Sequence, residues 1–129
     1  MNEQRISALA RRKLILLVED DEVHASLLYQ ILQQETPHQV RFTRDGETAW
    51  KLLQHIKPHL LIVDYLLPRI NGLELYDRLQ ASHRLKDLPV LLMSAAVPLQ
   101  EVKRRSLPYV LKPFELDDLL TTIEQLIVT

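Results

Sequence analysis

The chain reads Leu60-Leu61-Ile62-Val63-Asp64, an apolar run that ends in a carboxylate, and then continues as Tyr65-Leu66-Leu67-Pro68. A short, continuously apolar run predicts a buried β-strand, and the following proline indicates that the chain then enters a loop. A charged side chain at the end of a buried strand usually has a function, because burial without a partner is costly. Asp64 is therefore the first candidate functional residue.

Apolar runs alternate with helical periodicities along the chain. The fourfold spacing of Val23, Leu27 and Ile31 predicts a helix after the first run, and Leu75 and Leu79 predict one after residues 60–63. Two further helical stripes are Ala49, Leu52, Leu53 and Ile56, and then Leu116, Leu119, Leu120, Ile123, Leu126 and Ile127. Repeated β-α units of this kind predict a parallel sheet covered by helices.

The composition of the strands predicts their order. Residues 14–18, 60–63 and 90–93 are continuously apolar and so central, whereas 40–43 alternates and 109–111 is short, as edge strands tend to be. With right-handed crossovers, this favours the order 2-1-3-4-5. We predict an α/β fold with a doubly wound, five-stranded parallel sheet of flavodoxin-like order, which residues 13–129 form after an N-terminal extension of residues 1–12.

Composition narrows the classes of function. A chain of 129 residues that is 47% hydrophobic fits one domain, and 16 basic against 17 acidic residues leave a net charge of -1. No global positive field exists to bind nucleic acid or an anionic membrane directly. The absence of cysteine excludes disulfides, thiolate zinc sites and cysteine nucleophiles. The apolar runs are too short to insert into a membrane or to act as a signal peptide, so we expect a cytoplasmic protein.

Polar residues follow four of the predicted strands. Ligands bind such sheets at the carboxyl ends of the strands, so these residues are expected to meet in one crevice. They are Glu19 and Asp20 after the first strand, Asp64 after the third, Ser94 after the fourth and Lys112 after the fifth.

The predicted cluster favours a hard cation and phosphoryl chemistry. Carboxylates 4 Å apart repel one another by about 4 kcal/mol per pair at an effective dielectric near 20. Oxygen ligands without histidine or thiolate suit Mg²⁺, for which Glu19 and Asp20 form the natural pair. Asp64 would be the nucleophile that accepts a phosphoryl group, Lys112 would supply positive charge, and Ser94 would donate a hydrogen bond to the phosphoryl oxygens.

Several motifs together resemble those of response regulator receiver domains, the CheY-like family. They are Leu-Leu-Val-Glu-Asp-Asp-Glu at 16–22, Asp64 with Pro68 and Asn71-Gly72, Ser94-Ala95, and Tyr109 before Lys112-Pro113-Phe114. The resemblance covers nearly the whole chain from about Lys13. The chemotaxis member of that family has the same strand order, which supports the predicted topology by analogy.

The resemblance implies a role for each site residue. Asp64 would take a phosphoryl group from a phosphohistidine on a sensor histidine kinase or histidine phosphotransfer protein. Asp20 would bind Mg²⁺ directly, Glu19 would bind it through water, and Asp64 and the backbone carbonyl of Leu66 would be further ligands. Ser94 and Tyr109 would form the switch pair that responds to phosphorylation, and Lys112-Pro113 would be a cis peptide.

Other functions fit the residues less well. A phosphatase of the haloacid dehalogenase type would need an aspartate two positions after Asp64, where the chain has Leu66. A nucleotide-binding protein or a flavin carrier would need a phosphate loop, and the chain has only two glycines. The alternative that stays open is a receiver-like module that binds partners without being phosphorylated. In either case the domain is regulatory rather than an enzyme.

Lys112 follows Ser94 by 18 positions, which is about one helical turn shorter than the usual family interval. We therefore predict a shortened fourth helix with Pro98 in its first turn, and an output surface and choice of partner that differ from those of the family. No effector follows the last helix in this sequence: if the chain is complete, we expect a single-domain protein that signals through an unidentified downstream protein or by phosphoryl relay, and in a longer protein an effector domain would follow. Asp21 is predicted to cap the first helix. Histidines 24, 38, 55, 59 and 83 show no paired ligand spacing and are expected at the surface or in loops.

Overall fold

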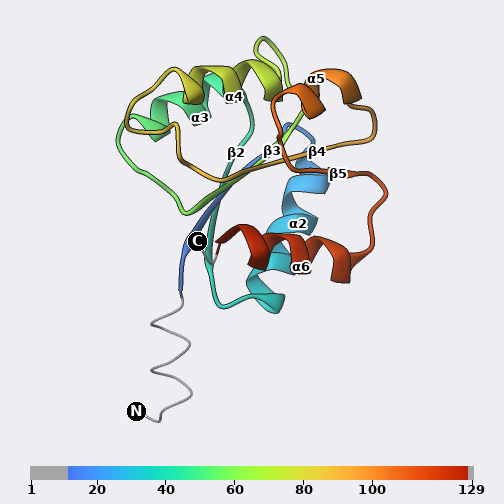
Figure 1. The fold of residues 1–129 in the computed structure, drawn as a ribbon. Coiled ribbons are helices and arrows are strands. Elements are labelled where there is room, and N and C mark those ends of the chain that lie inside the picture. The colour runs from blue at the N-terminus through green and yellow to red at the C-terminus, as the bar shows by residue number, and fades with distance from the viewer. Residues whose placement is uncertain (1–11, 128–129) are drawn as a thin grey trace.

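The computed structural model describes residues 12–127, which form one sheet with helices on both faces (Figure 1). The strands are β1 (Leu14–Val18), β2 (Gln39–Thr43), β3 (Leu60–Asp64), β4 (Val90–Ser94) and β5 (Tyr109–Leu111). Their order is β2-β1-β3-β4-β5, and every neighbouring pair is parallel. The predicted fold class and strand order are confirmed. Apart from Arg12, the predicted N-terminal extension lies outside the described residues.

Helices α2 (Glu22–Glu35) and α6 (Leu116–Ile127) cover one face of the sheet, as Figure 1 shows. The other face is covered by α3 (Gly46–Leu53), α4 (Gly72–Gln80) and α5 (Leu99–Arg104). Each face has its own cluster of buried side chains, and the two clusters divide the alternating residues of the strands between them. The central strands β1, β3 and β4 are therefore buried on both sides, which explains why they are continuously apolar.

Helix α2 forms where the fourfold repeat predicted a helix, but that repeat does not mark its buried side. Val23 and Leu27 are 73% and 53% exposed, whereas Ala25, Leu28 and Leu32 are buried. The helix carries apolar side chains on more than one side, and contact with β1 and α6 decides which side is buried. One apolar face of α2 is left at the surface.

The last two predicted helices differ from each other in how well they are packed. In α6, Leu119, Ile123 and Ile127 are buried along the predicted stripe, although Leu116 at its start is 38% exposed. Helix α5 has only six residues and follows Pro98, which offers no side-chain cap. The predicted shortening is confirmed, and such a short helix depends on tertiary contacts, here the buried Val102 and the side chain of Arg105.

Side-chain caps begin three of the helices. Asp21, Asp45 and Asn71 accept hydrogen bonds from the backbone N–H groups of His24, Thr48 and Glu74, respectively. The predicted capping role of Asp21 is confirmed. Asn71 and Glu74 complete a capping box at α4, which fixes the start of that helix next to the end of β3.

His38 lies in the loop before β2, but it is not a surface residue, because only 4% of it is exposed. Its Nδ1 accepts a hydrogen bond from the backbone N–H of Lys13, and its Nε2 lies 3.1 Å from Oε1 of Glu124 in α6. His59 accepts a similar bond from the backbone N–H of Leu14. Two imidazoles therefore hold the start of β1.

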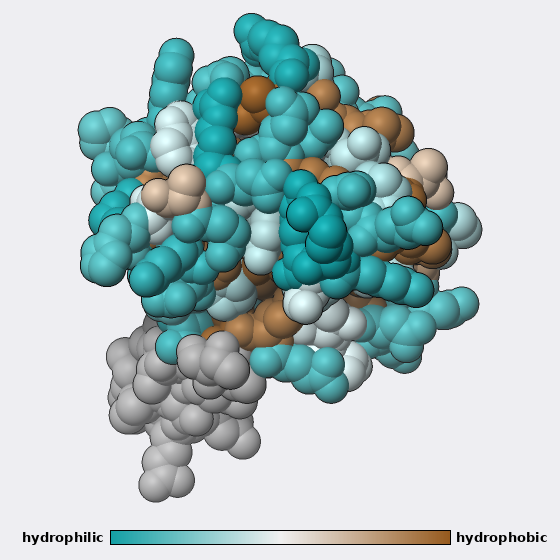
Figure 2. Space-filling view, turned by 45° about the horizontal axis from the view of Figure 1, so that its top comes forward, coloured by the Kyte–Doolittle hydropathy of each residue, from teal (hydrophilic) through white to brown (hydrophobic). Residues whose placement is uncertain are grey.

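The face of the molecule in Figure 2 is largely hydrophilic, and hydrophobic residues show there only in small separate areas. Within residues 12–127, no helix is both long enough and apolar enough to cross a membrane.

Candidate functional site

The predicted site residues come together at the carboxyl ends of the strands. Asp64 and Ser94 are the last residues of β3 and β4, Glu19 and Asp20 directly follow β1, and Lys112 directly follows β5. Carboxylate oxygens of Glu19, Asp20 and Asp64 all lie within 4.8 Å of one another. The Nζ of Lys112 lies 3.0 Å from Oε2 of Glu19 and 3.0 Å from Oδ2 of Asp64.

Backbone hydrogen bonds orient the two buried carboxylates. Oδ1 of Asp64 accepts from the N–H of Leu66 at 2.9 Å, and Oε1 of Glu19 accepts from the N–H of Asp21 at 3.1 Å. Each carboxylate thus uses one oxygen for the backbone and the other for Lys112. Glu19 and Asp64 are 1% and 5% exposed, whereas Asp20 is open to solvent.

Burial and mutual repulsion shape the ionisation of the cluster. Burial raises the pKa of Glu19 and the neighbouring Asp64 raises it further, while the hydrogen bond from Lys112 lowers it. For Lys112, burial alone would lower the pKa of the ammonium, but hydrogen bonds to Asp64 and Glu19 outweigh it and raise that pKa. The lysine therefore remains charged between the two carboxylates.

Gly72 allows α4 to begin against the end of β3. A Cβ at this position would lie 2.7 Å from the backbone carbonyl oxygen of Asp64 and 2.7 Å from Cδ1 of Leu92. Its N–H donates to the carbonyl of Tyr65. The glycine is required by the close approach of two backbones, and the approach fixes the position of Asp64.

Ser94 and Tyr109, the predicted switch pair, lie on the same side of the sheet. Tyr109 in β5 is the register partner of Leu92 in β4. Leu92 and Ser94 are two positions apart in the strand, so their side chains point to the same face of the sheet. The hydroxyl of Ser94 is buried and has no hydrogen-bond partner, whereas Tyr109 is half-buried against the core beneath α4 and α5. A buried hydroxyl without a partner is unusual, and among the described residues only that of Thr43 shares this condition.

The residues present suit a hydrated divalent cation. Three carboxylates and one ammonium leave two negative charges at the site when all are ionised. The available donors are oxygens, and exposed Asp20 leaves one side of the cluster open to water, as the coordination of Mg²⁺ prefers. Glu19, Asp20 and Asp64 are the side chains that could hold such an ion.

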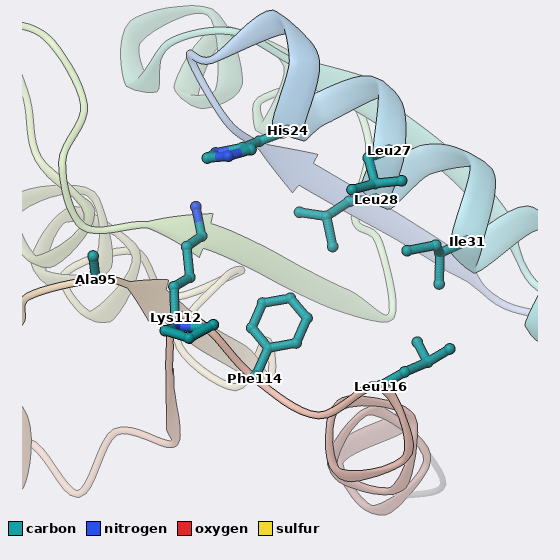
Figure 3. Close-up of a pocket in the computed structure, with 9 residues that line it drawn as sticks. His24, Leu27, Leu28, Ile31, Ala95, Lys112, Phe114 and Leu116 are labelled. Atoms are coloured by element: carbon teal, nitrogen blue, oxygen red, sulfur yellow. The ribbon is translucent and has the colours of Figure 1, made fainter.

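The sequence pattern did not predict an apolar groove beside this cluster. It lies between α2 and the start of α6, and Lys112 forms one end of it (Figure 3). The apolar stripe of α2 is the sequence signal for this groove, but its spacing by itself predicts only a helix.

A parallel sheet of this order, with carboxylates and a lysine at the carboxyl ends of its strands, defines a flavodoxin-like α/β domain. Residues 15–124 match the response regulator receiver domain family, and the chain belongs to that family. It is thus a regulatory domain of the kind that response regulators use in two-component systems. The cis peptide bond between Lys112 and Pro113, which the resemblance implied, is present.

Relatives and solved structures agree with this assignment. The chain is 27% identical to the probable methanogenesis regulatory protein FilR2 of Methanothrix harundinacea, covering 88% of this chain and 80% of that protein. It is 32% identical to the transcriptional regulatory protein PdtaR of Mycobacterium tuberculosis, covering 92% of this chain but only 57% of that protein. A putative response regulator from Chloroflexus aurantiacus superposes with a TM-score of 0.84 at 28% identity, over 92% of this chain and 99% of the other.

Proposed function

We propose that the domain accepts a phosphoryl group on Asp64, in a Mg²⁺-dependent reaction, from a phosphohistidine of a sensor histidine kinase or phosphotransfer protein. The observation that carries this proposal is the position of Lys112, whose Nζ bridges two buried carboxylates at the carboxyl edge of the sheet. A lysine placed there can neutralise charge on a phosphoryl group as it bonds to Asp64.

Each site residue has a task in this reaction. Oδ2 of Asp64, the oxygen that faces Lys112, attacks phosphorus, while the N–H of Leu66 holds Oδ1 in place. Asp20 would hold the metal ion directly, Glu19 would hold it through water, and the backbone carbonyl of Leu66 would be a further ligand. The bound ion supplies positive charge that stabilises the phosphoryl oxygens. The domain thus assists its own phosphorylation and dephosphorylation without being an enzyme that acts on a separate substrate.

Signalling follows from the unpaired hydroxyl of Ser94. A phosphoryl group on Asp64 would give the hydroxyl of Ser94 a hydrogen-bond acceptor. Movement of this hydroxyl toward the phosphoryl group would open space into which Tyr109 can turn. The readout is contact with a downstream protein or relay of the phosphoryl group, in the cytoplasm. Direct binding of nucleic acid by this domain is not part of the proposal.

A receiver-like module that binds partners without phosphorylation is the second candidate. It would require no particular chemistry at the carboxyl edge of the sheet, so the cluster of Glu19, Asp20, Asp64 and Lys112 argues against it.

The test is mass spectrometry after incubation with Mg²⁺ and acetyl phosphate. A mass increase of one phosphoryl group is expected in the unaltered protein and in Asp45→Asn, which changes an aspartate that caps α3 outside the cluster. The increase should be absent in Asp64→Asn. Phosphorylation that survives Asp64→Asn would refute the assignment, and its absence in all three proteins would favour the interaction module.

A further inference from the structure

An apolar groove of about 500 Å³ lies next to the carboxylate cluster. One wall is formed by α2, with Leu27, Leu28 and Ile31, and the opposite wall is formed by Phe114 and Leu116. Figure 3 shows these side chains facing each other across the space between the two helices. The size and the apolar lining are those of a site for a small molecule.

The groove is continuous with the proposed phosphorylation site. Lys112 lies at one end of the groove together with His24, and Ile31 and Leu116 lie at the other end (Figure 3). Ile31 lies seven positions after His24 along the helix, which gives the groove a length of about 10 Å. The Nζ of Lys112 is also the atom that bonds to Asp64. A molecule that reacts at Asp64 can therefore extend directly into the groove.

We infer that this groove binds the apolar tail of a small phosphodonor, an acyl phosphate with an alkyl chain. The inference rests on the proposed phosphorylation of Asp64 and adds a class of donor to it. An oxygen of Asp64 bonds to phosphorus as the bond between phosphorus and the acyl oxygen breaks. The products are the acyl phosphate of Asp64 and the alkyl carboxylate, and no proton or further reactant is required.

The distribution of charge favours this orientation of the donor. The anionic phosphoryl end belongs at Lys112 and the metal ligands, while the leucines, Ile31 and Phe114 along the groove offer only apolar contact. The released carboxylate would lie next to Glu19 and Asp20, whose charges repel it. Leu28 is 5% exposed at the floor of the groove, and Leu27 is 53% exposed at its rim, so a tail would cover apolar surface that is otherwise in water.

The experiment compares acetyl phosphate with hexanoyl phosphate at equal concentration, with Mg²⁺ present, and measures the initial rate of Asp64 phosphorylation by intact mass. A fully buried methylene contributes a factor of about four and a half-buried one about two, so four extra half-buried methylenes should raise the rate about 16-fold. Leu27→Ser should lower the ratio of the two rates to about three or less. The matched control is Leu99→Ser, because Leu99 is 43% exposed on α5, on the other face of the sheet, and this variant should keep the ratio.

Each outcome decides one of the two claims. The inference is overturned if the two donors react at equal rates or if Leu27→Ser leaves the ratio of the rates unchanged. Phosphorylation by acetyl phosphate would still uphold the proposed function, and the groove would then fit an apolar surface of a protein partner. Phosphorylation by neither donor overturns both claims.

Discussion

Lys112 is hydrogen bonded to Asp64 across the carboxyl edge of the sheet, with 3.0 Å between Nζ and Oδ2. The two residues come from strands that are separated by β4, and the same ammonium also lies 3.0 Å from Glu19. One positive charge thus faces three carboxylates. Without a metal ion, the site keeps a repulsion that the rest of the fold must offset.

This imbalance predicts that Asp20→Asn stabilises the metal-free protein. The substitution removes one of three like charges at an exposed position, so the free energy of unfolding should rise by up to about 1 kcal/mol in the presence of a chelator. Added Mg²⁺ should stabilise the unaltered protein and have little effect on Asp20→Asn. Urea unfolding with and without Mg²⁺ measures both quantities, with Asp87→Asn as an exposed control outside the cluster. An equal gain from Mg²⁺ in all three proteins would contradict the proposed metal site.

Gly72 and Gly46 offer a second, matched comparison, because each is the first residue of a helix. A Cβ on Gly46 would lie closest to side-chain atoms of Ile70, which can move, whereas one on Gly72 would meet the backbone of Asp64. Gly72→Ala should therefore destabilise the protein by about 1–3 kcal/mol, and Gly46→Ala by less. Gly72→Ala should also slow phosphorylation of Asp64 by acetyl phosphate. Equal unfolding midpoints for the two variants would contradict this prediction. They would show that the backbone at the end of β3 moves as easily as the side chain of Ile70 to accommodate an added Cβ.

The sheet and the site were predictable because the relevant signals are local. The apolar runs that end in Asp64 and Glu19 each predict a buried strand. They also predict that the two carboxylates lie at the carboxyl edge of the sheet. The buried side of α2 was not predictable from its own pattern, since Leu27 and Leu28 are equally apolar and only contact with β1 and α6 distinguishes them. The burial of His38 was also missed, because its partners are a backbone N–H and Glu124, 86 positions away.

The lifetime of the proposed acyl phosphate is a third prediction. Leu66 and Ala96 follow Asp64 and Ser94 by two positions and are both exposed, and neither carries a polar group to orient an attacking water. Hydrolysis should therefore be slow, and Leu66→Gln or Ala96→Gln should shorten the half-life several-fold. Loss of the phosphoryl mass with time after removal of the donor measures the half-life. Leu99→Gln on α5 is the control, and a half-life that neither Leu66→Gln nor Ala96→Gln shortens would count against this explanation.

The short helix α5 is expected to depend on Arg105. The guanidinium of this residue binds both carboxylate oxygens of Asp77 in α4 at 2.8 Å and reaches Glu101 at 2.9 Å. The hydrogen bonds from Arg105 lower the pKa of Asp77. Asp77→Asn should lower the free energy of unfolding by about 1 kcal/mol and increase hydrogen exchange at Val102, because a bidentate pair with two short hydrogen bonds contributes more than an ordinary surface pair. Glu47→Gln, which weakens the longer contacts of 3.2 and 3.5 Å with Arg78, should cost less than about 0.5 kcal/mol and leave Val102 protected.

His59 predicts a dependence of stability on pH. Burial lowers the pKa of its imidazole below the ordinary value of 6.5, and the charges of Lys13 and His38 lower it further. The neutral ring accepts a hydrogen bond from the N–H of Leu14, which a protonated Nδ1 could not do. Because the unfolded chain binds a proton more readily at this position, the contribution of His59 is fully present above pH 6.5 and is lost as the pH falls toward the lowered pKa of the folded state.

The variant His59→Gln removes this titration while keeping a side chain that can accept a hydrogen bond. Urea unfolding at about pH 7.5 and about pH 5.5 should show a larger loss of stability in the unaltered protein than in His59→Gln. His38 and its neighbours Lys13 and Glu124 are present in both proteins, so their effects cancel in the comparison. Identical losses in the two proteins would contradict the assignment of this pH dependence to His59 and would assign it to other groups that titrate between these two pH values.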